Sequence, residues 1–306
     1  MQYIEMNGED IFLNLATEEY VFEHFTDDSY LLLYKNDNSV VLGKYQNAYQ
    51  EINVPEAENL GIKVARRISG GGTVFHDRGN LNYSFITENK KTYLRSYDEF
   101  LSPVIHALQA MGIHAHKRNA CDIAIGDLKI SGSAQSVRGN RVLHHGTLLF
   151  DADMEKLHRL LKVTDAVIES KAVASVPSHV TNIREHIKEP SMTIEEFQDV
   201  LLAQIFPSGI SVRSFSEEDM REIHRLRDEK YRTWEWNWGK SPRFIFRRDD
   251  IELSVEHGII KKCQIPCLPQ EIEAALVGQR YGYHTMLQML LDAYGEEAKE
   301  IVDKLF

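Results

Sequence analysis

The chain has 306 residues, of which 43% are hydrophobic and 26% charged, a composition typical of a soluble globular protein with a sizeable core. Lysine and arginine total 35 against 46 aspartates and glutamates, and the formal net charge of −11 disfavours general nucleic-acid binding. Three cysteines cannot close a disulfide framework, and no apolar run approaches the ~18 residues of a membrane span, so we expect a cytoplasmic protein with no membrane or nucleic-acid partner.

The first half of the chain combines one amphipathic helix pattern with several short strand patterns. Residues 10–25 carry apolar side chains at helical spacing and predict a first helix. Residues 30–34 and 39–43 then predict a β-hairpin around the polar turn KNDN. Further strands are predicted over 64–68 and 82–87, a helix over 97–111, and two hairpins, 122–125 with 128–131 and 134–137 with 142–150.

The pattern changes near Trp234, where the aromatic run WEWNWGKSP separates two regions. Before it, helices are predicted over 154–161, 193–206 and 217–231, the second with a capping box that begins at Thr193. After it come strand patterns over 244–248, 251–257 and 259–265, and helix patterns over 269–277, 283–293 and 296–305. We therefore predict an α/β (α+β) protein with a large domain, residues 1–240, and a small α/β C-terminal domain, residues 241–306.

The segment RRISGGGTVFH, which runs from Arg66 to His76, has the composition of an anion-binding loop. Three consecutive glycines after a strand let the backbone approach a ligand and turn several N–H groups toward one point. The two arginines at its start add charge suited to paired oxygen contacts. The segment lacks the features of a P-loop and of a dinucleotide fingerprint. We favour a carboxylate or phosphate site over a merely flexible loop.

Lys129 lies beside a run of small residues, SGSA, that would leave space around its ammonium group. Strand alternation would place Asp122 on one face together with Ala124 and Gly126. A lysine in isolation is more often a solvated surface charge, so this pattern alone does not assign a function.

His144 and His145 are adjacent in a predicted strand. Their side chains would point to opposite faces and could not readily bind one metal ion. We expect one of them to be buried and hydrogen-bonded and the other to be exposed.

Four segments taken together resemble lipoate–protein ligases. They are RRISGGGTVFHDRGNLNYSF, LKISGSAQ, HHGTLLF and SVPSHVTNIRE, and they occur in this order. The resemblance covers about residues 30–240, and the C-terminal region is similar to the accessory domain of the longer bacterial ligases. It implies a large domain of mixed β-sheets wrapped by helices, related to biotin ligases, and a small domain that moves about residues 234–242 between half reactions.

The resemblance also implies the activity and the cofactors. Such ligases activate lipoate with ATP and Mg²⁺ to lipoyl-AMP, release pyrophosphate, and transfer the lipoyl group to a lysine of an acceptor domain. The acceptors implied are dehydrogenase E2 subunits and the glycine-cleavage H protein, and a monomer is the default expectation.

Individual residues can be matched to the family motifs. The resemblance implies that Lys129 contacts the lipoate carbonyl and the α-phosphate, and that Asp122 lies near the phosphates and Mg²⁺. It implies a nucleotide- and acyl-binding loop made of Arg67, Gly71, Gly72, Thr73, Val74 and Phe75. A strand that lines the lipoate pocket would contain His145, Gly146 and Thr147.

One departure from the family pattern leaves room for different activities. Where many of these ligases have Asn-Asp, this chain has Cys121-Asp122. Related acyltransferases, which need no ATP, carry the acyl group on a cysteine as a thioester, although their surrounding sequence differs from RNACDI. We therefore favour the ligase over a thioester-forming enzyme. A non-catalytic protein that binds lipoyl-AMP, and an enzyme that takes biotin in place of lipoate, are less favoured hypotheses.

Overall fold

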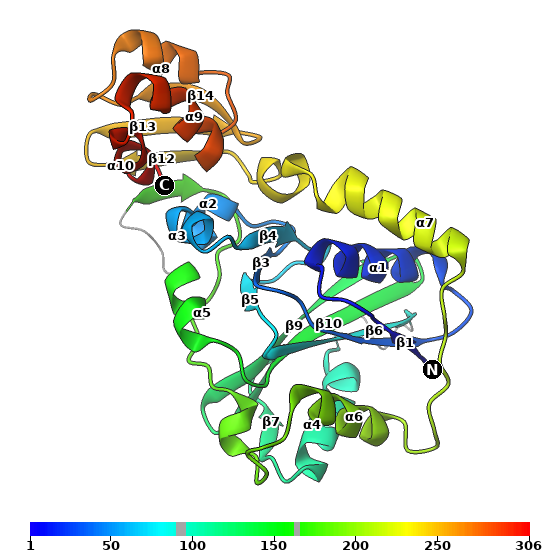
Figure 1. Cartoon of the computed structure of the whole chain (residues 1–306). Helices are drawn as coiled ribbons and strands as arrows, with labels where there is room; N and C mark the ends of the chain where they lie inside the picture. Colours follow the sequence, from blue (N-terminus) through cyan, green and yellow to red (C-terminus); the bar gives the residue numbers. More distant parts are fainter. Residues whose placement is uncertain (90–95, 162–165) are drawn as a thin grey trace.

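The computed structural model describes residues 1–89, 96–161 and 166–306 (Figure 1). Its largest sheet has seven strands in the order β1-β2-β6-β10-β9-β8-β7. β1 pairs with β2 in parallel and the other neighbours are antiparallel, so the sheet is mixed. The strands are β1 (Gln2–Glu5), β2 (Tyr30–Tyr34), β6 (Asn80–Glu88), β7 (Ala115–Lys117), β8 (Asp122–Ile125), β9 (Leu128–Arg138) and β10 (Arg141–Leu149).

A second sheet carries the glycine-rich segment. Its order is β4-β3-β5, formed by β3 (Ser39–Leu42), β4 (Lys63–Arg66) and β5 (Val74–His76). The predicted hairpin of residues 30–34 and 39–43 is therefore wrong, because β2 and β3 belong to different sheets. Every residue of both strands is buried, so each strand lies inside its own sheet and neither has the exposed face of a free hairpin.

Helices cover both faces of the large sheet. α1 (Ile11–His24) packs on β6 and β10, and α7 (Glu217–Leu226) packs on α1. α4 (Asp98–Ala110) and α6 (Ile194–Ile205) pack against each other on the other side, and the predicted capping box of Thr193 and Glu196 is present. The remaining helices of this region are α2 (Ala48–Glu51), α3 (Val54–Asn59), α5 (Met154–Leu160) and the short turns η2 (Ile183–His186), η3 (Arg227–Tyr231) and η4 (Glu235–Gly239).

The C-terminal residues fold around a sheet of their own, with the strand order β11-β12-β13-β14 (Figure 1). Strands β12 (Phe244–Arg248), β13 (Ile251–Glu256) and β14 (Ile259–Gln264) were predicted, and so were helices α8 (Gln270–Leu276), α9 (Tyr283–Tyr294) and α10 (Glu297–Asp303). The edge strand β11 (Val167–Ser170) was missed, and it comes from the region before residue 240. The mixed α/β character that we predicted is confirmed.

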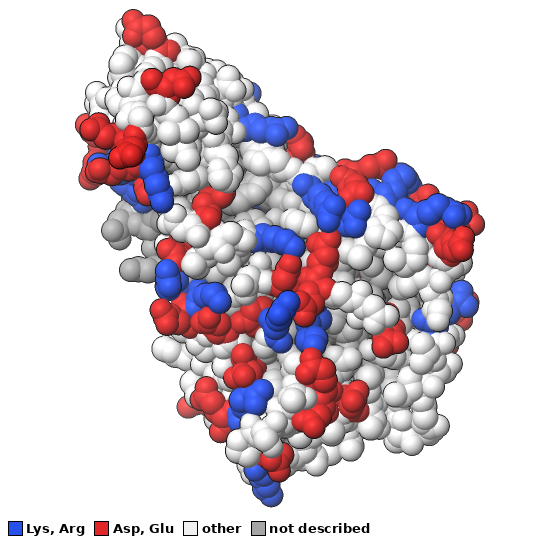
Figure 2. Space-filling view, viewed as in Figure 1, with Lys and Arg blue, Asp and Glu red and all other residues white. Residues whose placement is uncertain are grey.

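On the face seen in Figure 2, lysine and arginine side chains alternate with acidic ones. Within the described parts of the chain, no helix has the length and apolar character needed to cross a bilayer.

Candidate active site

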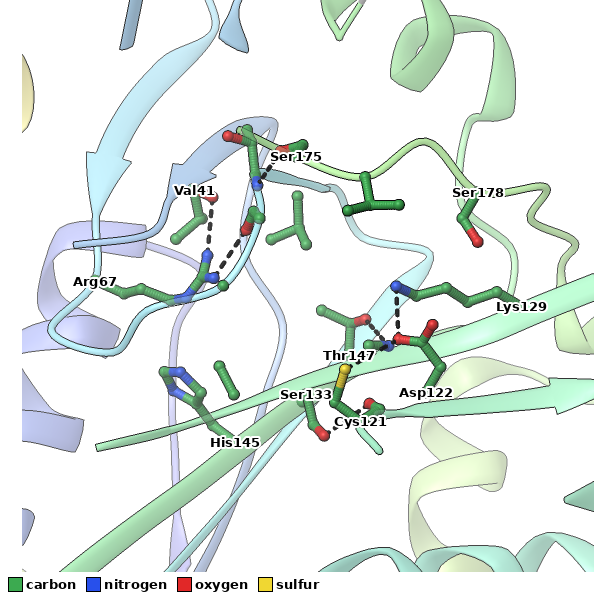
Figure 3. A pocket seen from close by; sticks show the side chains of 18 of the residues that line it. Val41, Arg67, Cys121, Asp122, Lys129, Ser133, His145, Thr147, Ser175 and Ser178 are labelled. Atoms are coloured by element: carbon green, nitrogen blue, oxygen red, sulfur yellow. Dashed lines mark hydrogen bonds and ion pairs between the residues drawn. The ribbon is translucent and has the colours of Figure 1, made fainter. Parts of the chain in front are cut away.

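A cavity of about 430 Å³ lies where the glycine-rich segment, β8, β9 and β10 meet (Figure 3). Residues 173–178 form a further part of its wall. A second cavity, of about 440 Å³, adjoins it. Residues from the glycine-rich segment, from β9 and β10, and from 174–178 line both cavities, among them Lys129. The two cavities therefore meet at the lysine that the sequence singled out.

Lys129 and Asp122 form an ion pair across strands β8 and β9. The ammonium nitrogen Nζ lies 2.8 Å from Oδ1 of Asp122 (Figure 3). The other carboxylate oxygen accepts hydrogen bonds from Asn119 Nδ2 at 2.7 Å and Arg118 Nη2 at 3.2 Å. Burial acts to raise the pKa of Asp122, but Lys129 and the other donors outweigh it and hold the pKa below its usual range. The carboxylate is therefore ionised and holds the ammonium group in place.

Gly132 supplies the space that the sequence predicted beside this ammonium group. A Cβ atom at position 132 would lie 2.8 Å from Lys129 Nζ and 2.9 Å from its Cε. Any larger residue there would displace the end of the lysine. The small residues after Lys129 thus leave the space that the end of its side chain occupies.

Arg67 organises the glycine-rich loop from within. Its guanidinium group donates to the carbonyl oxygens of Val41, Gly70 and Gly72 at 3.1, 2.6 and 2.8 Å, and to Ser69 Oγ at 3.0 Å. The group is buried, and burial lowers the pKa of Arg67 to about 10. Arg67 therefore shapes the loop as well as lining the cavity.

Arg66 lies elsewhere, which corrects the expectation that both arginines serve one anion. It is completely buried and donates to backbone carbonyl oxygens, including those of Gly43, Gln46 and Asn237. It does not line either cavity. Successive side chains along a strand point to opposite faces, so Arg66, the last residue of β4, points away from the side to which Arg67 points.

His145 joins the glycine-rich loop to the first helix. Its Nε2 is 2.6 Å from Ser69 Oγ, and its Nδ1 is 2.8 Å from Glu18 Oε2. Burial acts to raise the pKa of Glu18, but the charge of His145 and hydrogen bonds from three side chains lower it overall. A buried carboxylate in the middle of α1 therefore fixes the histidine ring at the wall of the cavity.

His144 points to the other face of the sheet, as strand alternation predicts, but it is also buried. Its ring stacks on Phe100 with 4.8 Å between the ring centres. The expectation that one histidine of the pair is exposed is wrong, because α1 covers one face of β10 and α4 covers the other. Helices on both faces leave no solvent side for either ring.

Four buried residues that line the first cavity were not predicted from the sequence. They are Leu15, Tyr34, His76 and Asn82, and none is more than 4% exposed. Asn36 Nδ2 donates to His76 Nδ1 at 2.9 Å, while burial and, to a lesser extent, the charge of Arg67 lower the pKa of His76 to about 3. The ring is thus neutral. Tyr34, His76 and Asn82 are polar residues within strands β2, β5 and β6, and this was the available signal in the sequence.

Cys121 also lines the first cavity, with its Sγ 3.7 Å from Asp122 Oδ1. Burial and the Asp122 carboxylate raise the pKa of the thiol, and the charges of Lys129 and Arg118 offset only part of that shift. A thiol kept protonated is a poor nucleophile at neutral pH.

The structure brings almost all predicted site residues to one cavity. Phe75 is the exception, since it lines the second cavity only. The first cavity is lined by Arg67, Gly71, Gly72, Thr73, Val74, Asp122, Lys129, His145, Gly146 and Thr147.

A cavity that combines a glycine-rich loop with a paired lysine suits an anionic ligand, and comparisons with known proteins specify the family. Residues 10–206 match the family described as lipoyl protein ligase A/B catalytic domain. The chain is 39% identical to lipoate–protein ligase 1 of Staphylococcus aureus, with 87% of this chain and 84% of that protein covered. It is also 39% identical to the lipoate-protein ligase LplJ of Bacillus subtilis, with 90% and 88% covered. The human mitochondrial lipoyl amidotransferase LIPT1 is 33% identical, with 89% and 80% covered.

Solved structures give the same result. A putative lipoate protein ligase from T. acidophilum with bound lipoic acid has a TM-score of 0.65 and 25% identity, and covers 78% of this chain and 98% of its own. A lipoate-protein ligase A bound with ATP has a TM-score of 0.65 and 27% identity, with 78% and 100% covered. A bi-partite lipoate protein ligase from Thermoplasma acidophilum, described with its E2 lipoyl domain, has a TM-score of 0.67 and 25% identity, with 81% and 98% covered.

The chain belongs to the lipoyl protein ligase A/B family. It is an enzyme, a lipoate–protein ligase, and the resemblance drawn from the four sequence segments is confirmed.

Proposed function

We propose that the chain activates lipoate with ATP to lipoyl-AMP, releases pyrophosphate, and transfers the lipoyl group to a lysine of an acceptor domain. The observation that carries this proposal is the position of Lys129, which is paired with Asp122 and lines both cavities. The first cavity ends among buried side chains, which suits an acyl tail. The second includes Phe75 and Leu149, whose apolar surface suits a nucleotide base.

The chemistry requires a cation where the two cavities meet. In the first half reaction, a carboxylate oxygen of lipoate attacks the α-phosphorus of ATP and the bond to the pyrophosphate oxygen breaks. Two anions must approach in line, so their repulsion has to be neutralised. The Lys129 ammonium group supplies this charge at a position that Asp122 fixes.

The second half reaction uses the same group. The acceptor amine attacks the carbonyl carbon of the mixed anhydride, a proton leaves the nitrogen, and the bond to the phosphate oxygen of AMP breaks. The ammonium group of Lys129 stabilises the oxyanion that develops on the carbonyl oxygen. Because AMP is a good leaving group, no covalent intermediate on Cys121 is required.

The acyl group would be held by the residues that line the first cavity. We assign the backbone of the glycine-rich loop to polar contacts with the ligand and Val74 to contact with its apolar tail. His145, kept in place by Glu18, and its strand neighbours complete the wall. The set comprises Arg67, Gly71, Gly72, Thr73, Val74, His145, Gly146 and Thr147.

Magnesium fits this site as an ion carried by the nucleotide. Among the described residues, no group of three or more His, Cys, Asp or Glu side chains could hold a metal ion. Mg²⁺ is commonly bound by one or two carboxylates together with phosphate oxygens and water. Asp122 is the residue that would hold it here, and the bound ion would neutralise phosphate charge.

We further propose that the acceptor is a lipoyl domain of a dehydrogenase E2 subunit or the glycine-cleavage H protein, and that the chain acts as a cytoplasmic monomer. A ligase of similar fold is described with its E2 lipoyl domain, which supports the first acceptor class. We also propose the division into a catalytic domain, residues 1–240, and an accessory domain, residues 241–306. The sheet that contains β12, β13 and β14 supports that division, and β11 adds an edge strand to it from residues 167–170.

Replacement of Lys129 by alanine tests the proposal. We expect Lys129→Ala to lower the rate of pyrophosphate release from lipoate and ATP by roughly 10²–10³-fold, the scale for removing one preorganised electrostatic partner. Lys117→Ala is the matched control, because Lys117 lies in the same sheet and pairs with Asp98 outside the cavities. A rate within threefold of the wild type for Lys129→Ala would contradict the assignment.

Mass spectrometry of acceptor proteins after incubation with enzyme, lipoate and ATP separates the candidate activities. A ligase adds one lipoyl group to the acceptor and depends on ATP. A thioester-forming transferase would act without ATP and lose activity in Cys121→Ala, while a non-catalytic binder would bind lipoyl-AMP and leave the acceptor unmodified. Competition with biotin tests the acyl specificity.

A further inference from the structure

The hydrogen bonds around His76 show which nitrogen of its neutral ring carries the proton. Asn14 Nδ2 lies 3.0 Å from Lys35 O and 2.8 Å from Asn36 Oδ1. A carbonyl oxygen only accepts, so the Asn14 nitrogen is the donor and Asn36 Oδ1 accepts from it. The amide nitrogen of Asn36 therefore donates to His76 Nδ1, at 2.9 Å. In a neutral imidazole whose Nδ1 accepts, the proton is on Nε2.

This Nε2–H group has no acceptor in the protein. The nitrogen is buried, and it has no hydrogen-bond partner among residues 1–89, 96–161 and 166–306. The Nδ1 edge of the ring faces Asn36, which does not line the cavity, so the edge that forms part of the cavity wall carries Nε2. A buried donor without a partner is unfavourable. Its presence in a cavity wall therefore points to an acceptor atom on a bound molecule.

Three other buried polar side chains of the same cavity wall already have partners. The Tyr34 hydroxyl group donates to Glu18 Oε1 at 3.2 Å. Asn82 Nδ2 donates to Tyr34 O, also at 3.2 Å. Both ring nitrogens of His145 lie within hydrogen-bond distance of a partner. In this group of four, the donor of His76 is the one left without a protein partner.

His76 lies on the side of the first cavity that faces away from the second. Lys129, Gly132 and Thr147 line both cavities, whereas His76 and Leu15 line only the first. A chain whose carboxylate is bound at Lys129 would thus have its other end beside His76. In lipoate that end is a five-membered ring with two adjacent sulfur atoms, and divalent sulfur is a weak hydrogen-bond acceptor. Octanoate, which has the same eight-carbon chain, ends in a methyl group and offers no acceptor there.

We propose that His76 is a specificity-determining residue whose Nε2–H group donates a hydrogen bond to a ring sulfur of lipoate and so favours lipoate over octanoate. This inference rests on the proposed function, because it takes the first cavity as the acyl site. With lipoate bound, sulfur satisfies the donor. With octanoate bound, the donor faces CH₂ and CH₃ groups and stays unpaired, which weakens that complex. The difference between the two complexes is what discriminates between the acids.

The competing explanation is a water molecule that satisfies the donor whichever acid is bound. A buried water usually makes about three hydrogen bonds, whereas Tyr34, Asn82 and His145 are already engaged with protein partners. A permanent water would make removal of the donor affect both acids alike. A contact with sulfur would make the effect depend on the acid.

The test compares the two acids in one enzyme. Pyrophosphate release by the full-length chain is measured at saturating ATP with lipoate and, separately, with octanoate. His76→Phe keeps an aromatic ring and removes the donor. We expect the ratio of kcat/KM for lipoate to that for octanoate to fall by about tenfold, mainly through KM, because the lipoate complex loses a hydrogen bond while the octanoate complex no longer contains an unpaired donor. His76→Gln retains an N–H donor and should keep part of the preference.

His106→Phe is the matched control, because His106 is exposed on α4 and lines neither cavity. Its ratio should stay within twofold of the wild type. Both acids are assayed on one preparation, so unfolded protein lowers both rates alike and leaves the ratio unchanged. The ¹⁵N chemical shifts of the His76 ring in the wild type should show the proton on Nε2.

An unchanged ratio in His76→Phe, whether both acids lose activity equally or neither does, overturns the proposal. A proton on Nδ1 in place of Nε2 also overturns it. If the wild type releases no pyrophosphate with either acid, the proposed function fails instead.

Discussion

At the scale of single residues, Cys121 lies within the cavity but in surroundings that oppose nucleophilic catalysis. Burial and the Asp122 carboxylate raise the pKa of its thiol, so at neutral pH the thiolate fraction is small. We therefore expect Cys121→Ala and Cys121→Asn to retain pyrophosphate release and acceptor lipoylation within about threefold of the wild type. The asparagine variant restores the residue found in many ligases of this kind.

Alkylation kinetics give an independent measurement. Cys267 is exposed, so iodoacetamide at pH 7.5 should modify it faster than Cys121, as peptide mass spectrometry after timed quenching can show. Faster labelling of Cys121, together with complete loss of acceptor modification in Cys121→Ala, would instead support a thioester route.

At the scale of elements, the glycine-rich loop owes its shape to particular glycines and not to glycine content as such. Gly71 has φ of +86°, and a Cβ atom there would lie 3.0 Å from Arg67 Nη2, whereas the nearest atom to a Cβ at Gly70 is 4.0 Å away in Tyr45. An L-residue with positive φ costs ~1–2 kcal/mol. We expect Gly71→Ala to raise the KM for lipoate by about tenfold, measured by pyrophosphate release at saturating ATP.

Gly70→Ala is the matched control in the same loop and should leave the KM for lipoate within about twofold. Gly71→Ala should unfold at a slightly lower temperature than Gly70→Ala, because only position 71 has a positive φ. An unchanged KM in Gly71→Ala would mean that this turn does not shape the acyl site.

Local pairings of strands could be predicted, and distant ones could not. The hairpins β8–β9 and β9–β10 follow from short turns between alternating patterns, and the structure has both. The wrong hairpin of β2 and β3 had the same local appearance. Each strand found its partners elsewhere, in β6 for β2 and in β4 and β5 for β3. Local patterning identifies a strand but does not specify a partner that lies far along the chain.

In the candidate site too, residues that stand out locally could be predicted, and residues that depend on distant contacts could not. The sequence indicated Lys129, Asp122 and the glycine-rich loop because charged and small residues stand out from their neighbours. Glu18 and Ser175 were missed because neither is unusual in its own segment. Each acquires its role through contacts more than 100 positions away, with His145 at 127 and with Glu51 at 124 positions.

At the scale of the whole molecule, the C-terminal sheet is tied to the site by contacts that no local pattern could reveal. β11 leads directly into the segment that contains residues 173–178 of the cavity wall. Arg66 binds the carbonyl oxygens of Gly43 and Asn237, which joins the start of the glycine-rich segment to η4. The predicted pivot at residues 234–242 is thus in contact with the loop that follows β3, and any movement of the C-terminal region would have to release these contacts.

Stability of the whole chain should depend on pH through its buried histidines. Burial and the charge of His145 lower the pKa of His144 to about 3, whereas in the unfolded chain it lies near 6.5. Between these values the unfolded chain binds more protons than the folded chain. The contribution of His144 to the free energy of unfolding therefore has its full size above pH 6.5 and falls as the pH decreases. At pH 5 the loss from this one residue is about 2 kcal/mol, and His76, with a similarly lowered pKa, adds to it.

His144→Phe removes this titration while keeping an aromatic ring to stack on Phe100, so the difference in unfolding free energy between pH 7.5 and pH 5 should shrink by about 2 kcal/mol. Urea unfolding at both values measures it. Gln135→Ala is the control, because it deletes the side chain whose Nε2 lies 3.1 Å from His144 Nδ1 and leaves the histidine in place. That variant should lose similar stability at both pH values. If His144→Phe keeps the full pH dependence of the wild type, the ring is not buried as a neutral base, and the packing of α4 against β10 must differ from the one described.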